Sequence, residues 1–348
     1  MPPYHNILVR GLNRIGDTLF SLPAIRALKI RYPEAKLTVF TKPLPVELYM
    51  HNPHIDEIII FNGKGDCQGI HQGRLELIKT LRDSNFDLAV LLHNNFESAL
   101  VAFLSGIPER IGYRKDFRSF FLTKSLPFPK APTPRAEQFL EITKLVECDT
   151  KEKKPDLYLS ETEREWAINR LGDLPPPLVG IIPGAQEISR IWDSGKFAVV
   201  ADTLIEKTKA NVLILGGPGD KKFSSSIKSK MKNIPLDFTG EFSLRELMAI
   251  IKSCNLVISN DTGPMHIACL LGVEVITFFG AGNLIETCPI GDKVHVIHRD
   301  LPCSPCLKSE CPKGNYECLE LITAEEVIEI ALHALKQPLI RLSSDSAQ

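Results

Sequence analysis

Short apolar runs alternate with longer amphipathic segments along almost the whole chain. The short runs predict buried strands, and the longer segments predict the helices that connect strands of a parallel sheet. Pro23 is expected to start or kink the first helix. In the first half, the predicted strands are Asn6–Arg10, Lys36–Phe40, Glu57–Phe61 and Asp87–Leu92, and the predicted helices are Asp17–Arg31, Gln72–Ser84 and Phe96–Leu104.

The same rhythm continues in the second half, after a charged and proline-rich stretch that runs from Lys151–Pro155 to Pro175–Pro177. Such a stretch suits an exposed connection, so we predict two domains, 1–175 and 176–348. Each is expected to be a Rossmann-like, doubly wound α/β domain, and the two domains are expected to face each other across a cleft. Whether the C-terminal helix packs back on the first domain is left open by the sequence. The predicted strands are Leu178–Ile182, Asn211–Leu215, Leu256–Ser259 and Val273–Phe279, and the predicted helices are Ser194–Thr208, Asp220–Lys232, Ser243–Ser253, Pro264–Leu271 and Ala324–Leu335.

Composition narrows the class of protein. The 348 residues include 41 Lys and Arg against 42 Asp and Glu, a net charge of −1, which argues against a strongly cationic nucleic-acid-binding protein. No apolar stretch approaches the roughly 18 residues that span a bilayer. The residues before Ile7 lack the basic flank of a secretory signal, so we expect a cytoplasmic protein.

The first strand leads into a glycine-containing loop, Gly11–Thr18, with the outline of a phosphate-binding P-loop. Asp17 stands where the P-loop lysine would be, and a carboxylate there would repel a triphosphate. Two interpretations of Asp17 remain: an N-cap of the following helix, or a general base. Gly16 would let a substrate approach the backbone, and Arg14 is a candidate to hold an anion beside it.

Loops of the second half suggest anion binding. Gly184 leaves space for a ligand, and Arg190 either contacts a phosphate or packs against the neighbouring Trp192. Asp220 either caps a glycine-rich turn or binds a ribose. The strongest signal is a strand followed by a helix start whose free N–H groups suit a diphosphate, with a histidine one turn into the helix. It comprises Asp261, Thr262, Gly263, Pro264, Met265 and His266.

Two motifs are missing from the sequence. It has no G-x-G-x-x-G, which counts against a dinucleotide oxidoreductase. It also has no D-x-D pair, the motif that commonly holds a divalent cation on a nucleotide-sugar diphosphate. A transferase built on these loops is therefore expected to need no metal and no other cofactor.

In this order, the loops resemble those of the ADP-heptose–lipopolysaccharide heptosyltransferases of glycosyltransferase family 9, inverting enzymes with the two-Rossmann GT-B fold. The resemblance covers nearly the whole chain, and the segments around Asn94–Leu100 and Arg110–Arg114 look most like heptosyltransferase II. Three departures are Arg190, where some members have lysine, Trp192-Asp193, where Trp-Pro is usual, and Arg135-Ala136-Glu137, in a region where histidine is frequent. The matching motifs are Arg14–Asp17, Pro183–Ala185, Arg190–Trp192, Asp261–His266 and Phe279-Gly280.

The resemblance implies a reaction and its residues. Asp17 would be the general base, and the sugar would come from ADP-L-glycero-D-manno-heptose. Arg190 and the Asp261–His266 helix start would stabilise the leaving ADP, while Asp220 and Phe242 would hold ribose and adenine. The acceptor would be the lipid-anchored inner core of lipopolysaccharide, which implies peripheral contact with the cytoplasmic face of the inner membrane. Its candidate contacts are Arg14, Gly16, Asn94, Arg114 and Arg118.

One basic stretch suits such an acceptor. Arg110, Arg114, Lys115, Arg118 and Lys124 are interleaved with Tyr113, Phe117, Phe120 and Phe121. The alternative interpretation is a solvated face with ordinary core aromatics.

Four of the nine cysteines, Cys303, Cys306, Cys311 and Cys318, fall in one window. The first pair has the separation of a zinc knuckle but the later spacings are loose, which leaves either packed thiols or a structural metal site.

Two other classes of function remain open from the sequence. One is a sugar-nucleotide epimerase or hydrolase of the same architecture, and the other is a non-catalytic protein that binds nucleotide sugars.

Overall fold

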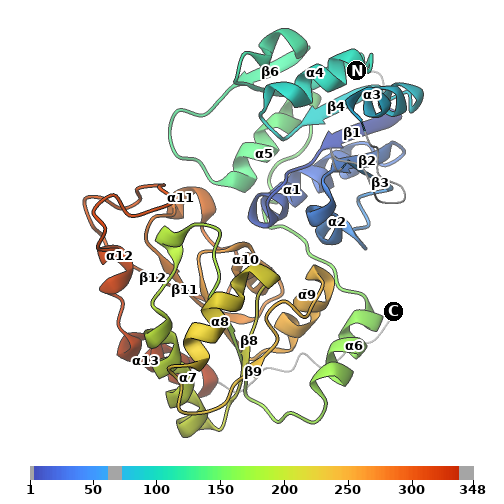
Figure 1. Cartoon of the computed structure of the whole chain (residues 1–348). Helices are drawn as coiled ribbons and strands as arrows, with labels where there is room; N and C mark the ends of the chain where they lie inside the picture. The colour runs from blue at the N-terminus through green and yellow to red at the C-terminus, as the bar shows by residue number, and fades with distance from the viewer. Residues whose placement is uncertain (1–3, 62–72, 337–348) are drawn as a thin grey trace. The chain divides into compact units, whose positions relative to one another are not determined.

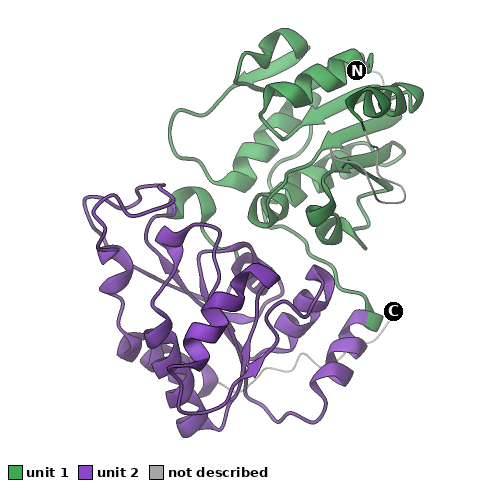
Figure 2. Cartoon of the chain, in the orientation of Figure 1, with its two compact units in different colours: residues 1–162, 284–290 green, residues 163–283, 291–348 purple. Residues whose placement is uncertain are grey.

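The computed structural model describes residues 4–61 and 73–336, which form two compact units (Figures 1 and 2). Unit 1 contains Met1–Thr162 and Leu284–Ile290, and unit 2 contains Glu163–Asn283 and Gly291–Gln348. The division between the units, at Thr162 and Glu163, lies about one helix before the predicted boundary at 175. The charged and proline-rich residues flank helix α6 (Glu161–Leu171), which belongs almost entirely to unit 2 because Arg245 pairs with Glu163.

Unit 1 is built on a six-stranded, fully parallel sheet in the order β3-β2-β1-β4-β5-β6. Its strands are β1 (Asn6–Arg10), β2 (Lys36–Thr41), β3 (Glu57–Ile60), β4 (Leu88–Leu91), β5 (Glu109–Arg114) and β6 (Lys124–Pro127). Its α-helices are α1 (Ile15–Arg31), α2 (Pro43–Tyr49), α3 (Arg74–Asp83), α4 (Phe96–Leu104), α5 (Arg135–Thr143) and α11 (Leu284–Thr287), with the 3₁₀ helices η1 (Arg118–Phe121) and η2 (Lys144–Val146).

Unit 2 carries a second six-stranded parallel sheet, in the order β12-β11-β10-β7-β8-β9. Its strands are β7 (Leu178–Ile182), β8 (Asn211–Ile214), β9 (Leu236–Asp237), β10 (Leu256–Asn260), β11 (Glu274–Phe279) and β12 (Val294–His298). Besides α6, its helices are η3 (Ile188–Arg190), α7 (Ser194–Thr208), η4 (Pro218–Asp220), α8 (Lys221–Lys228), α9 (Leu244–Ser253), α10 (Gly263–Leu270), α12 (Glu317–Glu320) and α13 (Ala324–Lys336).

Counted from the first strand of each unit, the two sheets have the same order, the doubly wound order of a Rossmann domain. Strand order reverses between β1 and β4 in unit 1, and between β7 and β10 in unit 2. Ligands of such sheets bind where the order reverses, at the carboxyl ends of the strands. The loops that follow these four strands are therefore the places to look for a site.

One helix differs from the sequence-based expectation: Pro23 lies inside a continuous α1, so it does not start that helix. Helix α13 packs on α7 and β11 within unit 2, where Val327 and Ala331 are fully buried. Packing of the C-terminal helix on unit 1 stays a prediction. Gln72, the predicted start of the second helix, lies outside the described residues.

Within residues 4–61 and 73–336, no helix is long and apolar enough to cross a membrane.

Candidate active site

The first loop places Asp17 in the opening turn of α1, at the point where the strand order of unit 1 reverses. The N-cap of α1 is Arg14, which makes no side-chain capping hydrogen bond. Asp17 is the third residue inside the helix, and its side chain is 32% exposed. The N-cap interpretation of Asp17 is therefore wrong, and the carboxylate remains accessible to a substrate.

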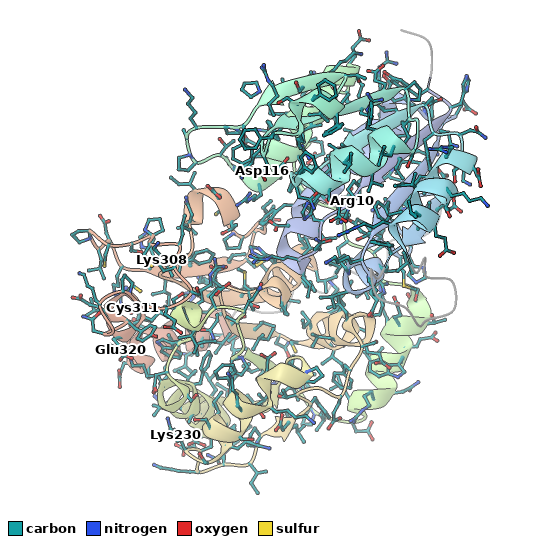
Figure 3. The ribbon with its side chains drawn as sticks, turned by 45° about the horizontal axis from the view of Figure 1, so that its top comes forward. Arg10, Asp116, Lys230, Lys308, Cys311 and Glu320 are labelled. Atoms are coloured by element: carbon teal, nitrogen blue, oxygen red, sulfur yellow. The ribbon has the colours of Figure 1, made fainter. Side chains whose placement is uncertain are left out.

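The loop under Asp17 is held by a buried arginine that the sequence analysis missed. Arg10, at the end of β1, donates to the carbonyl oxygens of Gly11 (2.5 Å) and Phe40 (3.3 Å), and to Oδ1 of Asn13 (3.3 Å). Figure 3 labels it within unit 1. Burial lowers the pKa of Arg10 to about 10, so it stays cationic at neutral pH. Gly11 is required here, because a Cβ would lie 2.6 Å from the Tyr49 hydroxyl.

Arg135, at the start of α5, is the charged neighbour of Asp17. Its Nε lies 4.0 Å from Oδ1 of Asp17, and its guanidinium also pairs with Glu286 of α11 at 2.8 Å. The sequence marked Arg135 only as a departure from a family pattern. The structure places its guanidinium beside the Asp17 carboxylate, at ion-pair distance.

The other acceptor candidates divide by exposure. Arg14 and Arg114 are exposed, and Gly16 and Asn94 are partly exposed. Asn94 follows β4, the second strand at the reversal, so it shares that sheet edge with Asp17. Burial lowers the pKa of the neighbouring His93, whose Nε2 lies 3.0 Å from the Asn13 amide.

Arg118 is a correction. It is fully buried, and its guanidinium donates to the carbonyl oxygens of Tyr113 (2.8 Å) and His93 (2.5 Å) and to Oδ1 of Asn94 (3.0 Å). A side chain enclosed in this way cannot contact a sugar at the surface. It braces the loop that carries Asn94, a role that the periodicity of a basic stretch does not reveal.

In unit 2, the loops after β7 and β10 meet through an ion pair. Nη1 of Arg190 lies 2.9 Å from Oδ2 of Asp261, which is only 3% exposed. Burial raises the pKa of Asp261 to about 6, although the Arg190 charge opposes this shift. A Cβ on Gly282, in the loop after β11, would lie 2.1 Å from Oδ2 of Asp261, so three loops converge on this carboxylate.

The start of helix α10 supplies backbone N–H groups beside this pair. Thr262 is its N-cap and makes no side-chain capping hydrogen bond, and Pro264 lies in the first turn. Pro264 has no N–H, so the free donors of this helix start are the backbone N–H groups of Thr262, Gly263 and Met265, which suit an anion. Met265 is a correction, because its side chain is fully buried and packs against Cys269, which leaves only its backbone for a ligand.

His266 is buried in the first turn of α10. It is 5% exposed, and burial together with the Arg190 charge lowers its pKa to about 4. The imidazole is therefore neutral at pH 7 and cannot balance a diphosphate charge. The side-chain cation of this site is Arg190.

Asp220 closes the glycine-rich turn after β8. Its carboxylate accepts a hydrogen bond from the Gly217 N–H at 2.9 Å, and burial raises its pKa. The turn-capping interpretation is confirmed, and the ribose contact stays a prediction. A Cβ on Gly184 would lie 2.1 Å from Oδ1 of Asp220, so Gly184 is what allows the two loops to meet.

Phe242, the adenine candidate, is partly exposed and belongs to an aromatic group in unit 2. Its ring lies 5.6 Å from Trp166 and 5.3 Å from Phe238, with the Arg170 guanidinium 5.6 Å away. Such a ring offers a stacking surface, and contact with adenine stays a prediction.

Asn260 was missed by the sequence analysis, although it ends β10 directly before Asp261. Its side chain accepts from the Trp192 backbone N–H (3.0 Å) and donates to the Pro183 carbonyl oxygen (2.7 Å). It thereby fixes the loop that carries Gly184 and Arg190. Trp192 itself is 1% exposed and packs on Phe278, so Arg190 and Trp192 do not form a surface pair.

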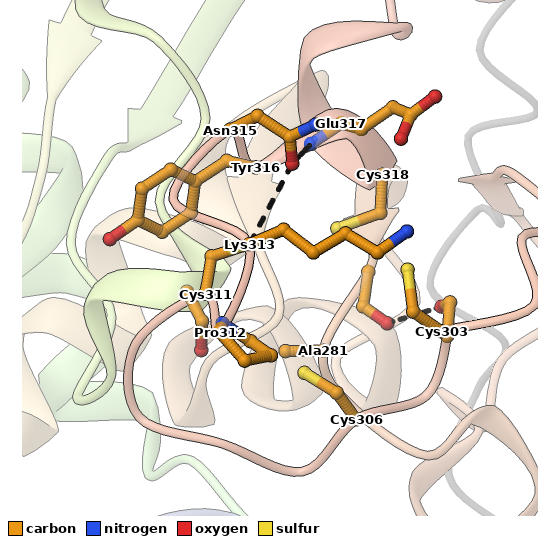
Figure 4. A pocket seen from close by; sticks show the side chains of 13 residues that line it. Ala281, Cys303, Cys306, Cys311, Pro312, Lys313, Asn315, Tyr316, Glu317 and Cys318 are labelled. Atoms are coloured by element: carbon orange, nitrogen blue, oxygen red, sulfur yellow. Dashed lines mark hydrogen bonds between the residues drawn. The ribbon is translucent and has the colours of Figure 1, made fainter.

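The four clustered cysteines line one pocket of unit 2 (Figure 4). Burial and the three neighbouring thiols raise the pKa of Cys318, whereas backbone N–H groups, that of Tyr316 foremost, lower the pKa of Cys311. Across the described part of the chain, however, no three His, Cys, Asp or Glu residues are grouped so as to hold a metal ion. The pocket gathers Cys303, Cys306, Cys311 and Cys318 without arranging them as ligands.

Comparison with known proteins defines the class. Residues 74–317 match the model of glycosyltransferase family 9 (heptosyltransferase), and the chain belongs to this family. Its two doubly wound sheets are those of the GT-B fold found in heptosyltransferase structures.

Within the family, the chain is similar to heptosyltransferases II. It is 27% identical to lipopolysaccharide heptosyltransferase 2 of Escherichia coli (strain K12), over 93% of this chain and 96% of the relative. Identity is 28% to the Salmonella typhimurium enzyme of the same name, over 94% and 98%.

Solved structures of the same family are also similar to this chain. The structure of E. coli ADP-heptose lps heptosyltransferase II has a TM-score of 0.81 at 26% identity, covering 95% of this chain and 98% of that one. A glycosyl transferase family 9 structure from Veillonella parvula DSM 2008 has a TM-score of 0.84 at 25% identity, covering 96% and 98%.

Proposed function

We propose that this heptosyltransferase-family protein transfers a heptose from ADP-L-glycero-D-manno-heptose to a hydroxyl of the inner core of lipopolysaccharide, with inversion at the anomeric carbon. The observation that carries the proposal is the accessible Asp17 carboxylate where the unit 1 strand order reverses, not used as a helix cap. The similar heptosyltransferases 2 support the substrate class.

In the proposed reaction, the Asp17 carboxylate takes the proton of the acceptor hydroxyl as that oxygen attacks the anomeric carbon. The hydroxyl oxygen attacks from the face opposite ADP. The bond between the anomeric carbon and the phosphate oxygen of ADP therefore breaks as the new glycosidic bond forms. Arg135, 4.0 Å from Asp17, holds the carboxylate in position. Arg14, Gly16, Asn94 and Arg114 are the acceptor contacts of unit 1 in this proposal.

Unit 2 binds the donor. Negative charge grows on the diphosphate as ADP leaves, and Arg190 and the backbone N–H groups of Thr262, Gly263 and Met265 meet that charge. Gly184 allows its loop to lie against the Asp220 carboxylate, and Asp220 and Phe242 contact the ribose and the adenine. Asp261 keeps Arg190 in place through its 2.9 Å ion pair. The proposal requires neither a divalent metal nor another cofactor, because protein groups serve the diphosphate.

The test is a transfer assay with purified protein, ADP-heptose and a panel of truncated core acceptors, the product identified by mass spectrometry. A heptose-extended core of inverted configuration is the expected product. Turnover of ADP-heptose without any acceptor would instead support an epimerase or hydrolase, and binding without turnover would support a non-catalytic role.

A further inference from the structure

Unit 1 exposes an unusual group of phenylalanines on α4 and η1, which we call the aromatic patch: Phe96, Phe103, Phe117, Phe120 and Phe121. The Phe121 ring contacts three of the other members, lying 5.3 Å from Phe96, 5.3 Å from Phe103 and 5.6 Å from Phe120. Phe117 is 97% exposed and Phe120 is 83% exposed. Contiguous exposed apolar surface of this kind marks an interaction site.

The turn that presents these rings is held firmly from inside. Asp116 and Phe117 both have left-handed backbone conformations, with φ of 52° and 57°, which non-glycine residues adopt at a cost. Beneath them, the buried Arg118 ties the turn to the carbonyl oxygens of Tyr113 and His93. Phe117 is the N-cap of η1 and Phe120 is its third residue, so one short turn presents both exposed rings.

The sequence around the aromatic patch is rich in basic residues, unlike the whole chain. Residues 110–130 contain six basic residues and one acidic residue, Asp116, whereas the full chain has a net charge of −1 (Asp116 is labelled in Figure 3). Arg118 is buried and adds no surface charge. Arg114 and Lys115 are exposed, and the Lys115 ammonium lies 4.2 Å from the centre of the Phe128 ring. Lys124 is paired with Glu109 and adds less free charge.

Aromatic rings beside basic side chains are the composition that binds the interface of an anionic bilayer. Rings enter at the level of the headgroups, and Lys and Arg meet the lipid phosphates. Because all six strands of unit 1 are parallel, the turn after β5 lies at the same sheet edge as the loops of Asp17 and Asn94.

We propose that unit 1 docks on an anionic lipid bilayer through Phe117 and Phe120, with Arg114 and Lys115 on the lipid phosphates. The proposal does not depend on the transfer reaction, since it follows from exposure, backbone conformation and charge. A second copy of the chain is the alternative occupant of the aromatic patch. The positive charge disfavours it, because two such surfaces would repel each other.

The experiment uses the full chain and vesicles without lipopolysaccharide or nucleotide sugar, in flotation assays. Vesicles of phosphatidylcholine alone are compared with vesicles that contain one quarter phosphatidylglycerol. We expect binding to the anionic vesicles, weakening as salt is raised, and little binding to the neutral ones. Phe117→Ala/Phe120→Ala should lower the partition coefficient at least tenfold. The control Ile168→Ala/Ile234→Ala, which removes apolar residues of unit 2 that are 64% and 96% exposed, should not lower it.

Circular dichroism and melting temperature check that both variants fold, which the exposure of the substituted residues favours. Equal binding to neutral and anionic vesicles, or wild-type binding by the phenylalanine variant, would overturn the proposal. So would a dimer abolished by that variant in a protein that binds no vesicles. Transfer to a deacylated acceptor in free solution tests the proposed reaction separately, so failure of one proposal is distinguishable from failure of the other.

Discussion

Replacing Asp17 with asparagine removes the proposed base while keeping the size of the side chain. The structural cost is small because Asp17 does not cap α1. The Asp17→Asn variant loses a favourable interaction between the carboxylate and the helix dipole in the first turn of α1, which stabilises the folded protein by about 0.3–1 kcal/mol. It also loses a 4.0 Å ion pair with Arg135, with both side chains about one third exposed, worth about 0–1 kcal/mol. Unfolding free energy should therefore fall by no more than about 2 kcal/mol.

Loss of a general base is a larger effect. Turnover should fall by about 10²–10⁴, which corresponds to about 2.7–5.4 kcal/mol in the activation free energy. ADP affinity should stay near that of the wild type, since Asp17 lies in unit 1 and the ADP contacts are proposed in unit 2. Turnover is measured by release of ADP under saturating donor and acceptor, stability by urea unfolding, and ADP affinity by calorimetry.

Glu137→Gln is a matched control for Asp17→Asn. Glu137 is an acid in the first turn of α5, its side chain is 37% exposed, and it pairs with Lys153 at 2.7 Å. It has the same kind of helix position and ion pair as Asp17, without a place in the proposed reaction. Near-normal turnover in folded Asp17→Asn protein, or an equal loss of turnover in Glu137→Gln, would refute the assignment of Asp17 as base.

Three further predictions concern donor binding and stability. Arg190→Ala should weaken ADP binding about 10- to 150-fold by calorimetry, because one charge-assisted contact contributes about 1.5–3 kcal/mol; unchanged affinity would remove Arg190 from the site. Transfer should persist in excess EDTA; loss restored by magnesium would contradict the metal-independent mechanism, and loss restored only by zinc would implicate the cysteine pocket. Asp261 has a pKa of about 6 in the folded protein, above the ordinary value of 3.8, so its contribution to stability is present below pH 4 and is lost as pH rises through 6. Asp261→Asn should therefore gain stability relative to wild type between pH 4 and pH 7 in urea unfolding, and a constant difference across that range would contradict the shift.

The sequence predicted the central strands of both sheets, because runs such as Ile7–Val9 and Val257-Ile258 are continuously apolar and end in polar loops. It missed β5 and β6, where charged and polar residues leave only short apolar runs, and also β9 and β12, the edge strands of unit 2. The loops at the strand-order reversals were also predictable, since they follow the most apolar strands.

Side-chain roles within these loops were less predictable. Arg118 and Arg14 look equivalent as sequence, but one is buried among carbonyl oxygens and the other is exposed. Likewise, nothing local to Arg135 indicates that it lies beside Asp17, because this contact depends on how α5 packs against α1. Long-range packing decides such roles, and local pattern does not record it.

The assignment of Leu284–Ile290 to unit 1 means that the half of the protein bearing Asp17 is not one continuous stretch of chain. A fragment that stops at Thr162 would lack Glu286, the acid that pairs with Arg135 at 2.8 Å. Of its two ion-pair partners in this unit, Asp17 and Glu286, Arg135 would then keep Asp17. An isolated base-bearing half would thus need the α11 segment grafted back to reproduce the electrostatic surroundings of Asp17.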